Sequence, residues 1–126
     1  MDAHKVQLAH EFGLFAEEKA TEEYIKRGCV VLERRWRLGK TEIDIIVQEG
    51  DTIVIIEVKG RSGRDMSPLE AITPDKKRRM VKAADVYIRR LKGTYNYRFD
   101  IVTITGNKDQ YTLEILEDAF LSADIF

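Results

Sequence analysis

Three charged residues lie in an otherwise apolar stretch, and their types suit metal-assisted chemistry on phosphate esters. The stretch "IDIIVQEGDTIVIIEVKG", residues 43 to 60, carries Asp44, Glu57 and Lys59 among isoleucines and valines. Carboxylates hold hard divalent cations, and an ammonium offsets the charge that develops when a phosphodiester is attacked. This chemistry requires that folding bring the three side chains together.

The turn residues 49–51, "EGD", predict that the stretch folds into a hairpin. Symmetric pairing about this turn places Asp44 opposite Glu57, and Glu42 opposite Lys59. Direct cross-strand neighbours have Cβ atoms about 5 Å apart, and residues two positions apart on one strand share a face. Asp44, Glu57 and Lys59 therefore converge, whereas a slip of one residue would turn Asp44 to the opposite face.

Two readings of this trio follow from the residues alone. Facing carboxylates repel each other and lose hydration, and a bridging Mg²⁺ or Mn²⁺ would offset both costs while leaving Lys59 free to contact a phosphate. The alternative is a structural salt bridge among Asp44, Glu57 and Lys59. Glu17, at the edge of an apolar helical stripe, either leans toward the sheet as a further ligand or faces solvent.

The elements that must position these residues are predicted from periodicity and turn signals. Leu8, Ala9 and Phe12 begin the apolar stripe of the first helix, and Thr73 caps the second. The expected order is αβββαββ: a helix over 4–27, a strand over 29–38, the hairpin, a helix from Pro74 to near Gly93, and strands over 97–105 and 111–116. A loop is expected from 60 to 73, and residues 119–126 form a short tail.

Length and composition predict one domain over residues 1–126, because the chain has 126 residues and 44% of them are hydrophobic. A single cysteine, Cys29, and two histidines exclude an internal disulfide and argue against a zinc site. No apolar run of about 18 residues and no signal-peptide pattern are present, so the protein is expected in the cytoplasm and not in a membrane.

Positive charge is concentrated in the segment 59–92, which has eleven basic and four acidic residues. This gives the segment a net charge of +7, so the rest of the chain carries −8 of the overall −1. Such a segment favours a polyanion such as nucleic acid, although a solvated helix surface is the ordinary alternative. The candidate nucleic-acid-binding residues are Arg61, Arg64, Arg78, Lys82 and Arg89.

Lys76 differs from the other basic residues of the second helix. It lies near the helix start, on the same side as the apolar Met80 and Tyr87, and is expected to point inward. There it would either hold a phosphate near the metal or pair with a carboxylate such as Asp44 or Glu57. Lys76 is therefore a candidate catalytic residue in either arrangement.

The sequence resembles the YraN family along almost the whole chain. The segments that carry the resemblance are "AEEKATEEYIKRG", "RRWRLGKTEIDIIVQEGDTIVIIEVKGRS", "AITPDKKRRM", "RFDIVTITGN" and "EDAF". The resemblance implies an α/β, restriction-endonuclease-like αβββαβ core with a central mixed sheet flanked by helices. It also implies the PD-(D/E)XK nuclease signature and a layout similar to that of archaeal Holliday-junction resolvases.

By this resemblance, Asp44 is the signature acid, Glu57 the second acid and Lys59 the signature lysine. Asp44 and Glu57 would ligate Mg²⁺ together with the carbonyl of Val58, Glu17 would assist, and Lys59 would orient the attacking water. Further matches are Lys76 at the start of the second helix and Asp100, which is expected to be structural. The sequence departs from the family's pattern where no Pro precedes Asp44, and at Ala16, where relatives commonly have Gly.

The preferred function is a metal-dependent nuclease that hydrolyses DNA phosphodiester bonds, with branched or other non-duplex DNA as candidate substrates. One alternative is a nucleic-acid-binding protein that keeps the nuclease fold without cutting. Another is an interaction module whose basic face meets an acidic protein. A nuclease for symmetric junctions needs two active sites, which a two-fold homodimer would supply, although no stretch of sequence identifies a dimer surface.

Overall fold

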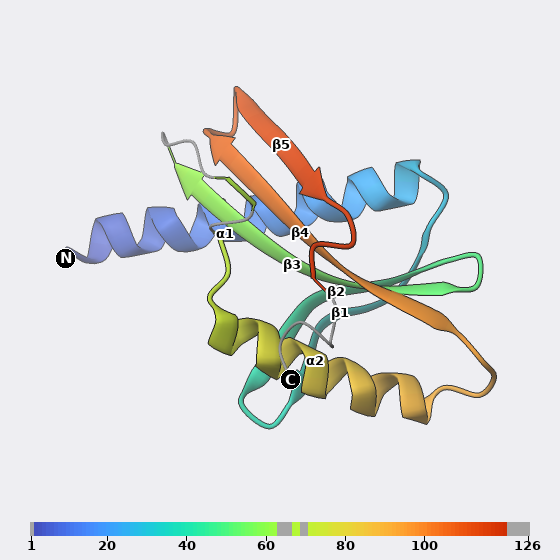
Figure 1. Ribbon diagram of the computed structural model, residues 1–126. Helices are drawn as coiled ribbons and strands as arrows, with labels where there is room; N and C mark the ends of the chain where they lie inside the picture. The colour runs from blue at the N-terminus through green and yellow to red at the C-terminus, as the bar shows by residue number, and fades with distance from the viewer. Residues whose placement is uncertain (1, 63–66, 69–70, 121–126) are drawn as a thin grey trace.

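The computed structural model describes residues 2–62, 67–68 and 71–120 of the chain (Figure 1). The elements follow the expected αβββαββ order. They are α1 (Ala3–Lys26), β1 (Val30–Leu38), β2 (Thr41–Glu49), β3 (Thr52–Ser62), α2 (Pro74–Arg90), β4 (Asn96–Gly106) and β5 (Tyr111–Leu116). Most of the expected tail, from 121 onward, lies outside the described residues.

The five strands form one mixed sheet in the order β1-β2-β3-β4-β5. Every neighbouring pair is antiparallel except β3 and β4, which run parallel. A parallel pair requires a crossover, and α2 lies in the connection between these two strands. The predicted mixed α/β sheet is confirmed, and its arrangement is compatible with a restriction-endonuclease-like core.

The two helices cover opposite faces of the sheet, and each face has its own core (Figure 1). Because side chains alternate along a strand, β3 sends Val54 and Ile56 toward α1 and Ile53 and Ile55 toward α2. The α1 core includes Phe12, Ala16, Ala20 and Tyr24, and the α2 core includes Met80, Ala84, Tyr87 and Phe99.

The first turns of α1 extend beyond the sheet, as Figure 1 shows. Residues 2–10 are exposed, and Leu8 keeps 50% of its accessible surface. The expected burial of Leu8 and Ala9 is therefore wrong, because no described part of the sheet lies opposite this end of the helix. The buried stripe starts at Phe12.

Two local features place α1 and α2 next to the end of β3. Thr73 caps α2 as predicted, its side chain accepting a hydrogen bond of 3.2 Å from the backbone N–H of Lys76. The expected loop begins later than Gly60, because β3 continues to Ser62. At Gly60 a Cβ atom would lie 3.0 Å from the Ala16 Cβ and 3.1 Å from the Phe12 ring, so the absent side chain lets α1 approach β3 closely.

Neither helix in the described part of the chain has the length and apolar character needed to cross a membrane.

Candidate active site

The sheet divides at the far end of the β2–β3 hairpin. The two strands pair from Glu49↔Thr52 to Ile45↔Ile56, which is the predicted register. Beyond Ile45, β2 stays paired with β1 as far as Thr41, and β3 stays paired with β4 as far as Ser62. The hairpin strands therefore separate at their ends, and the space between them opens into a cavity.

Asp44 occupies the point where the strands separate. Asp44 is one residue beyond the last pair of the ladder, Ile45↔Ile56, and its Oδ2 accepts a 2.8 Å hydrogen bond from the backbone N–H of Val58. The carboxylate thus takes the place of a backbone acceptor and fixes the distance between the two strands. The symmetric register that predicts Asp44 opposite Glu57 is followed up to the adjacent pair, Ile45↔Ile56.

Glu57 is buried, with 4% of its surface exposed, and its charge is only partly compensated. The Nζ atom of Lys76 lies 3.3 Å from its Oε2 and donates a 3.2 Å hydrogen bond to the backbone carbonyl of Glu42. Lys76 therefore points inward, as its helical position predicts. The contact with Glu57 is an ion pair without hydrogen-bond geometry, so Oε2 has no hydrogen-bond donor among the described residues.

The electrostatics of this pair disfavour two ionised carboxylates. Burial, followed by the adjoining Glu57 carboxylate, raises the pKa of Asp44 to about 8, while the Val58 N–H and Lys76 act in the opposite direction. A divalent cation between the carboxylates would remove the repulsion that a single lysine leaves. The carboxylate pair could therefore hold a divalent cation, and a structural salt bridge with Lys76 is the alternative.

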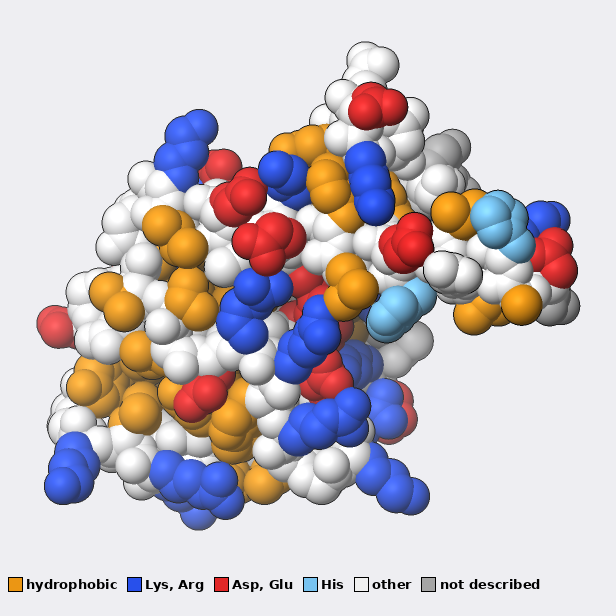
Figure 2. All heavy atoms as spheres, turned by 180° about the vertical axis from the view of Figure 1, so that it is seen from behind, with side chains coloured by type: hydrophobic (Ala, Val, Ile, Leu, Met, Phe, Trp, Pro, Cys, Tyr) orange, Lys and Arg blue, Asp and Glu red, His pale blue; other side chains and the backbone are white. Residues whose placement is uncertain are grey.

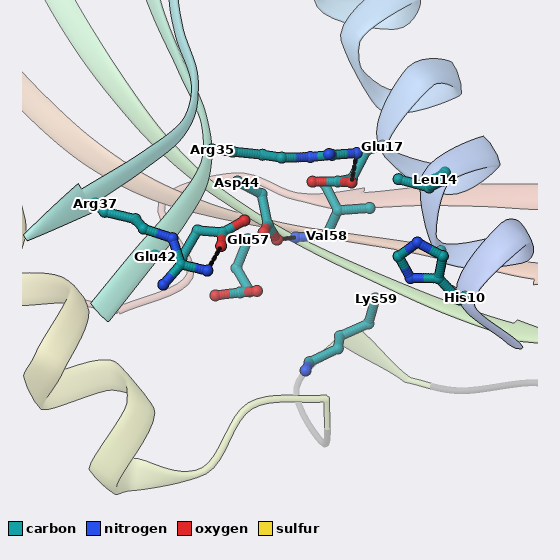
Figure 3. Close-up of a pocket in the computed structure, with 12 residues that line it drawn as sticks. His10, Leu14, Glu17, Arg35, Arg37, Glu42, Asp44, Glu57, Val58 and Lys59 are labelled. Atoms are coloured by element: carbon teal, nitrogen blue, oxygen red, sulfur yellow. Dashed lines mark hydrogen bonds and ion pairs between the residues drawn. The ribbon is translucent and has the colours of Figure 1, made fainter. Parts of the chain in front are cut away.

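The cavity beside these residues has a volume of about 540 Å³ (Figure 3). Figure 3 shows the side chains of Glu57 and Lys59 extending from β3 to the same side. The lining residues are His10, Gly13, Leu14, Glu17, Arg35, Arg37, Glu42, Asp44, Glu57, Val58, Lys59 and Gly60. Asp44, Glu57 and Lys59 therefore share one cavity, together with Val58 and with Glu17 of α1.

A group of three carboxylates forms the acidic part of the cavity. Glu17, Glu42 and Asp44 each contribute one oxygen, and the three oxygens lie within 4.8 Å of one another. Two arginines of β1 pair with the outer members: Arg35 Nη2 lies 3.0 Å from Glu17, and Arg37 Nη2 lies 2.8 Å from Glu42 (Figure 3). Glu17 therefore faces the cavity rather than bulk solvent.

Comparison with known proteins identifies the family. The profile described as "Uncharacterised protein family UPF0102" matches residues 16–104. The chain belongs to the UPF0102 family. The predicted resemblance to the YraN family is confirmed, because that family and UPF0102 are the same.

UPF0102 proteins of two bacteria match most of the chain. A UPF0102 protein of Phocaeicola vulgatus is 38% identical over 112 residues, which cover 88% of this chain and 93% of the relative. One from Caldicellulosiruptor saccharolyticus is 40% identical over 114 residues, covering 87% and 97%. The region matched by the family profile runs from Ala16 to Ile104, and it includes Glu17, Asp44, Glu57, Lys59 and Lys76.

The UPF0102 structure does not bring the predicted nucleic-acid-binding residues to the cavity. On α2, Arg78 pairs with Asp75 at 3.3 Å and Arg89 pairs with Asp85 at 3.0 Å. Lys82 and Arg61 are exposed outside the cavity, and Arg64 lies outside the described residues. On the face seen in Figure 2, Lys and Arg side chains are scattered among acidic and apolar ones.

Sequence reasoning missed several cavity residues of the UPF0102 protein, and some had a signal. Glu42 was placed opposite Lys59 by the hairpin register, close to the predicted site. His10 lies two helical turns before Glu17, on the same side of α1, so its position in the cavity could have been predicted from that of Glu17. No periodicity predicts Arg35 and Arg37, because Arg35 adopts a left-handed backbone (φ 52°) in the middle of β1.

Proposed function

We propose that this protein is a metal-dependent nuclease that hydrolyses phosphodiester bonds of nucleic acid, with DNA as the first candidate. The observation that carries the proposal is the meeting of two carboxylates, Asp44 and Glu57, where β2 and β3 separate. They share a cavity of about 540 Å³ with the ammonium-bearing Lys59. Two carboxylates from the ends of neighbouring strands can hold a metal ion, and the lysine two residues after Glu57 can offset phosphate charge. This combination suits phosphodiester hydrolysis.

The residues present fit a hard divalent cation such as Mg²⁺ or Mn²⁺. Asp44 and Glu57 would hold it with the backbone carbonyl of Val58, and Glu17 of α1 would assist. The fit is supported by the buried Glu57 Oε2, which lacks a hydrogen-bond donor among the described residues, and by the raised pKa of Asp44. Such a cation supplies Lewis-acid polarisation of a phosphate oxygen and lowers the pKa of a bound water.

The protein's own residues would orient the reactants and balance charge. Lys59 projects into the cavity from β3, where its ammonium would offset the phosphate charge and orient the attacking water. The water oxygen bonds to phosphorus, the ester P–O bond breaks, the released oxygen gains a proton and the water loses one to solvent. Lys76, paired with Glu57 at 3.3 Å, would hold that carboxylate in position.

The ion pair of Lys76 with Glu57 also supports a second candidate function. It already offsets one charge of the acidic pair, as a structural salt bridge would. The protein would then bind nucleic acid without cleaving it, and binding would weaken steeply with added salt. In either case, a two-fold dimer would present two cavities to a symmetric junction, which a measurement of mass in solution tests.

Cleavage of labelled linear duplex, single-stranded and four-way-junction DNA tests the proposal, with Mg²⁺, Mn²⁺ or a chelator present. We expect Asp44→Asn and Lys59→Met each to lower the cleavage rate by about 100-fold or more, because each removes charge stabilisation from the reacting phosphate. The matched control is Asp75→Asn, an exposed carboxylate of α2, which should cleave at the parent rate. Equal cleavage by all four proteins, or cleavage that survives the chelator, would exclude the assignment.

A further inference from the structure

The two cavity-lining arginines of β1, Arg35 and Arg37, are bound to carboxylates that suit a metal ion. We propose that they are exchangeable counter-ions: they neutralise Glu17 and Glu42 in the metal-free protein and turn to a substrate phosphate when a divalent cation takes those carboxylates. The inference rests on the proposed function and adds the residues that bind the phosphodiester and a coupling between metal and substrate binding.

Each arginine is attached to the acidic group by one hydrogen bond. Arg35 Nη2 donates to Glu17 Oε2 at 3.0 Å, and Arg37 Nη2 donates to Glu42 Oε2 at 2.8 Å. A guanidinium carries five N–H donors in a planar fork, so neither contact uses the full capacity of the group. Both arginines can therefore take a second acceptor.

The arginine side of each ion pair is open to solvent. The side chains of Arg35 and Arg37 are 49% and 66% exposed, whereas those of Glu17 and Glu42 are 13% and 28% exposed. Each guanidinium can therefore leave its carboxylate for solvent at little cost to its own hydration. The carboxylates they bind are crowded, because one oxygen each of Glu17, Glu42 and Asp44 lie within 4.8 Å of one another. A divalent cation at this group would replace both guanidinium charges at once.

A separate observation points to a cation next to Asp44, one member of this group. The buried Oε2 of Glu57, adjoining Asp44, has no hydrogen-bond donor among the described residues. A bound ion would compensate it, which neither β1 arginine does. The Glu57 carboxylate beside Asp44 is therefore only partly compensated, by its ion pair with Lys76.

The backbone of Arg35 shows that its direction is specifically held. In a regular strand Arg34 and Arg35 would point to opposite faces, yet they pair with the neighbouring α1 residues Glu18 and Glu17. The positive φ of 52° at Arg35 makes this possible. A non-glycine residue in the left-handed region costs about 1 kcal/mol or more, and such strain is concentrated at functional sites.

Phosphate is the ligand that best suits the released arginines. A guanidinium binds phosphate through two parallel hydrogen bonds, which a lone carboxylate contact of the kind seen here does not exploit. Among the described cavity-lining residues Lys59 is a further cation, and it forms no ion pair with a described residue. Lys76 of α2 is paired with Glu57, and the other described basic side chains of α2 do not line the cavity. A phosphodiester entering the cavity would meet Arg35, Arg37 and Lys59.

The experiment measures metal and DNA binding in the same variants, without requiring cleavage. Mn²⁺ affinity is measured by electron paramagnetic resonance, and DNA affinity by fluorescence anisotropy with Ca²⁺ in place of Mg²⁺. In Arg35→Gln and in Arg37→Gln we expect Mn²⁺ to bind about two- to five-fold more tightly, because a competing cation is gone. DNA should bind about five-fold more weakly in the same variants, because a phosphate contact is lost.

Arg34→Gln is the matched control, because it removes the same charge from the same strand while its partner, Glu18, lies outside the cavity. It should change neither affinity by more than about two-fold. The exchange of arginine for metal is overturned if both cavity variants bind Mn²⁺ no more tightly than the parent protein. It is also overturned if Arg34→Gln gains as much Mn²⁺ affinity as the cavity variants do. Unchanged DNA affinity overturns the phosphate role. In one outcome, the parent protein cuts no DNA while Arg35→Gln and Arg37→Gln still bind Mn²⁺ more tightly and DNA more weakly. That result would refute the proposed nuclease reaction and would support the exchange of arginine for metal.

Discussion

Two buried carboxylates lie on neighbouring strands, and they differ in how far the protein satisfies their hydrogen-bonding capacity. Asp100 of β4 stands beside Ile56 in the parallel ladder, one position from Glu57 of β3. Asp100 is fully buried, and its oxygens accept hydrogen bonds from the Tyr24 hydroxyl at 2.7 Å, Arg98 Nε at 3.1 Å and the Asp118 N–H at 3.0 Å. Both of its oxygens are thus fully occupied by the protein itself.

Glu57 is almost as deeply buried, but the protein leaves it incomplete. Lys76 lies 3.3 Å from Oε2, and no described residue donates a hydrogen bond to that oxygen. Burial alone therefore does not distinguish these two carboxylates. The difference lies in whether the surroundings satisfy the carboxylate, as they do at Asp100, or leave capacity for a ligand, as they do at Glu57.

The largest expected effect is on the satisfied side of this comparison. Asp100→Ala should lower the free energy of unfolding by about 3–5 kcal/mol, because it leaves the buried Tyr24 hydroxyl and the Asp118 N–H without their acceptor and leaves Arg98 with Glu49 alone. Urea denaturation measures the loss. The milder Tyr24→Phe removes one donor and should cost about 1 kcal/mol. A loss below 1 kcal/mol in Asp100→Ala would contradict a structural role for this carboxylate.

Much of this arrangement was predictable from local sequence signals. The "EGD" turn fixes the β2–β3 register, and the period of two along β3 places Glu57 and Lys59 on one side. The helical period of α2 directs Lys76 inward, where it meets Glu57. The central carboxylate pair and its lysines follow from these short-range rules.

The rest of the cavity depends on features that periodicity does not report. Nothing in the pattern shows that β2 leaves β3 beyond Ile45, or that Arg35 has a positive φ within a strand. The pattern of α1 gives the buried face of the helix but not the extent of the sheet, so Leu8 was expected to be buried and is exposed. Likewise, the basic charge of α2 identifies a solvated surface without showing where the cavity lies.

The pH dependence of stability sharpens the contrast on the unsatisfied side. Burial and then Glu57 raise the pKa of Asp44 to about 8, whereas an unfolded aspartate titrates near 3.9. Between these values the folded state holds a proton that the unfolded state has released, so stability falls as the pH rises from about 4 to about 8.

In metal-free protein this fall should be larger in the parent than in Asp44→Asn, by on the order of 2–3 kcal/mol. Asn keeps an oxygen that can accept from the Val58 N–H, so the strand separation is preserved in the variant. Urea denaturation at pH 5, 6, 7 and 8 with a chelator present gives the difference. Parallel curves for the two proteins would show that Asp44 is already ionised in the folded state.

The smallest expected change in stability is at Glu57, in contrast to the large loss expected at Asp100. Glu57→Gln removes the ion pair with Lys76 but also the cost of keeping a carboxylate charge buried, and Lys76 keeps its hydrogen bond to the Glu42 carbonyl. These effects offset each other, so the unfolding free energy of the metal-free protein should change by less than about 1 kcal/mol.

Mn²⁺ affinity of Glu57→Gln should nevertheless fall by about ten-fold or more, because a buried ligand oxygen is lost. Urea denaturation with a chelator and Mn²⁺ titration measure the two quantities on one preparation. A large loss of stability with unchanged Mn²⁺ affinity would place Glu57 in the same structural class as Asp100.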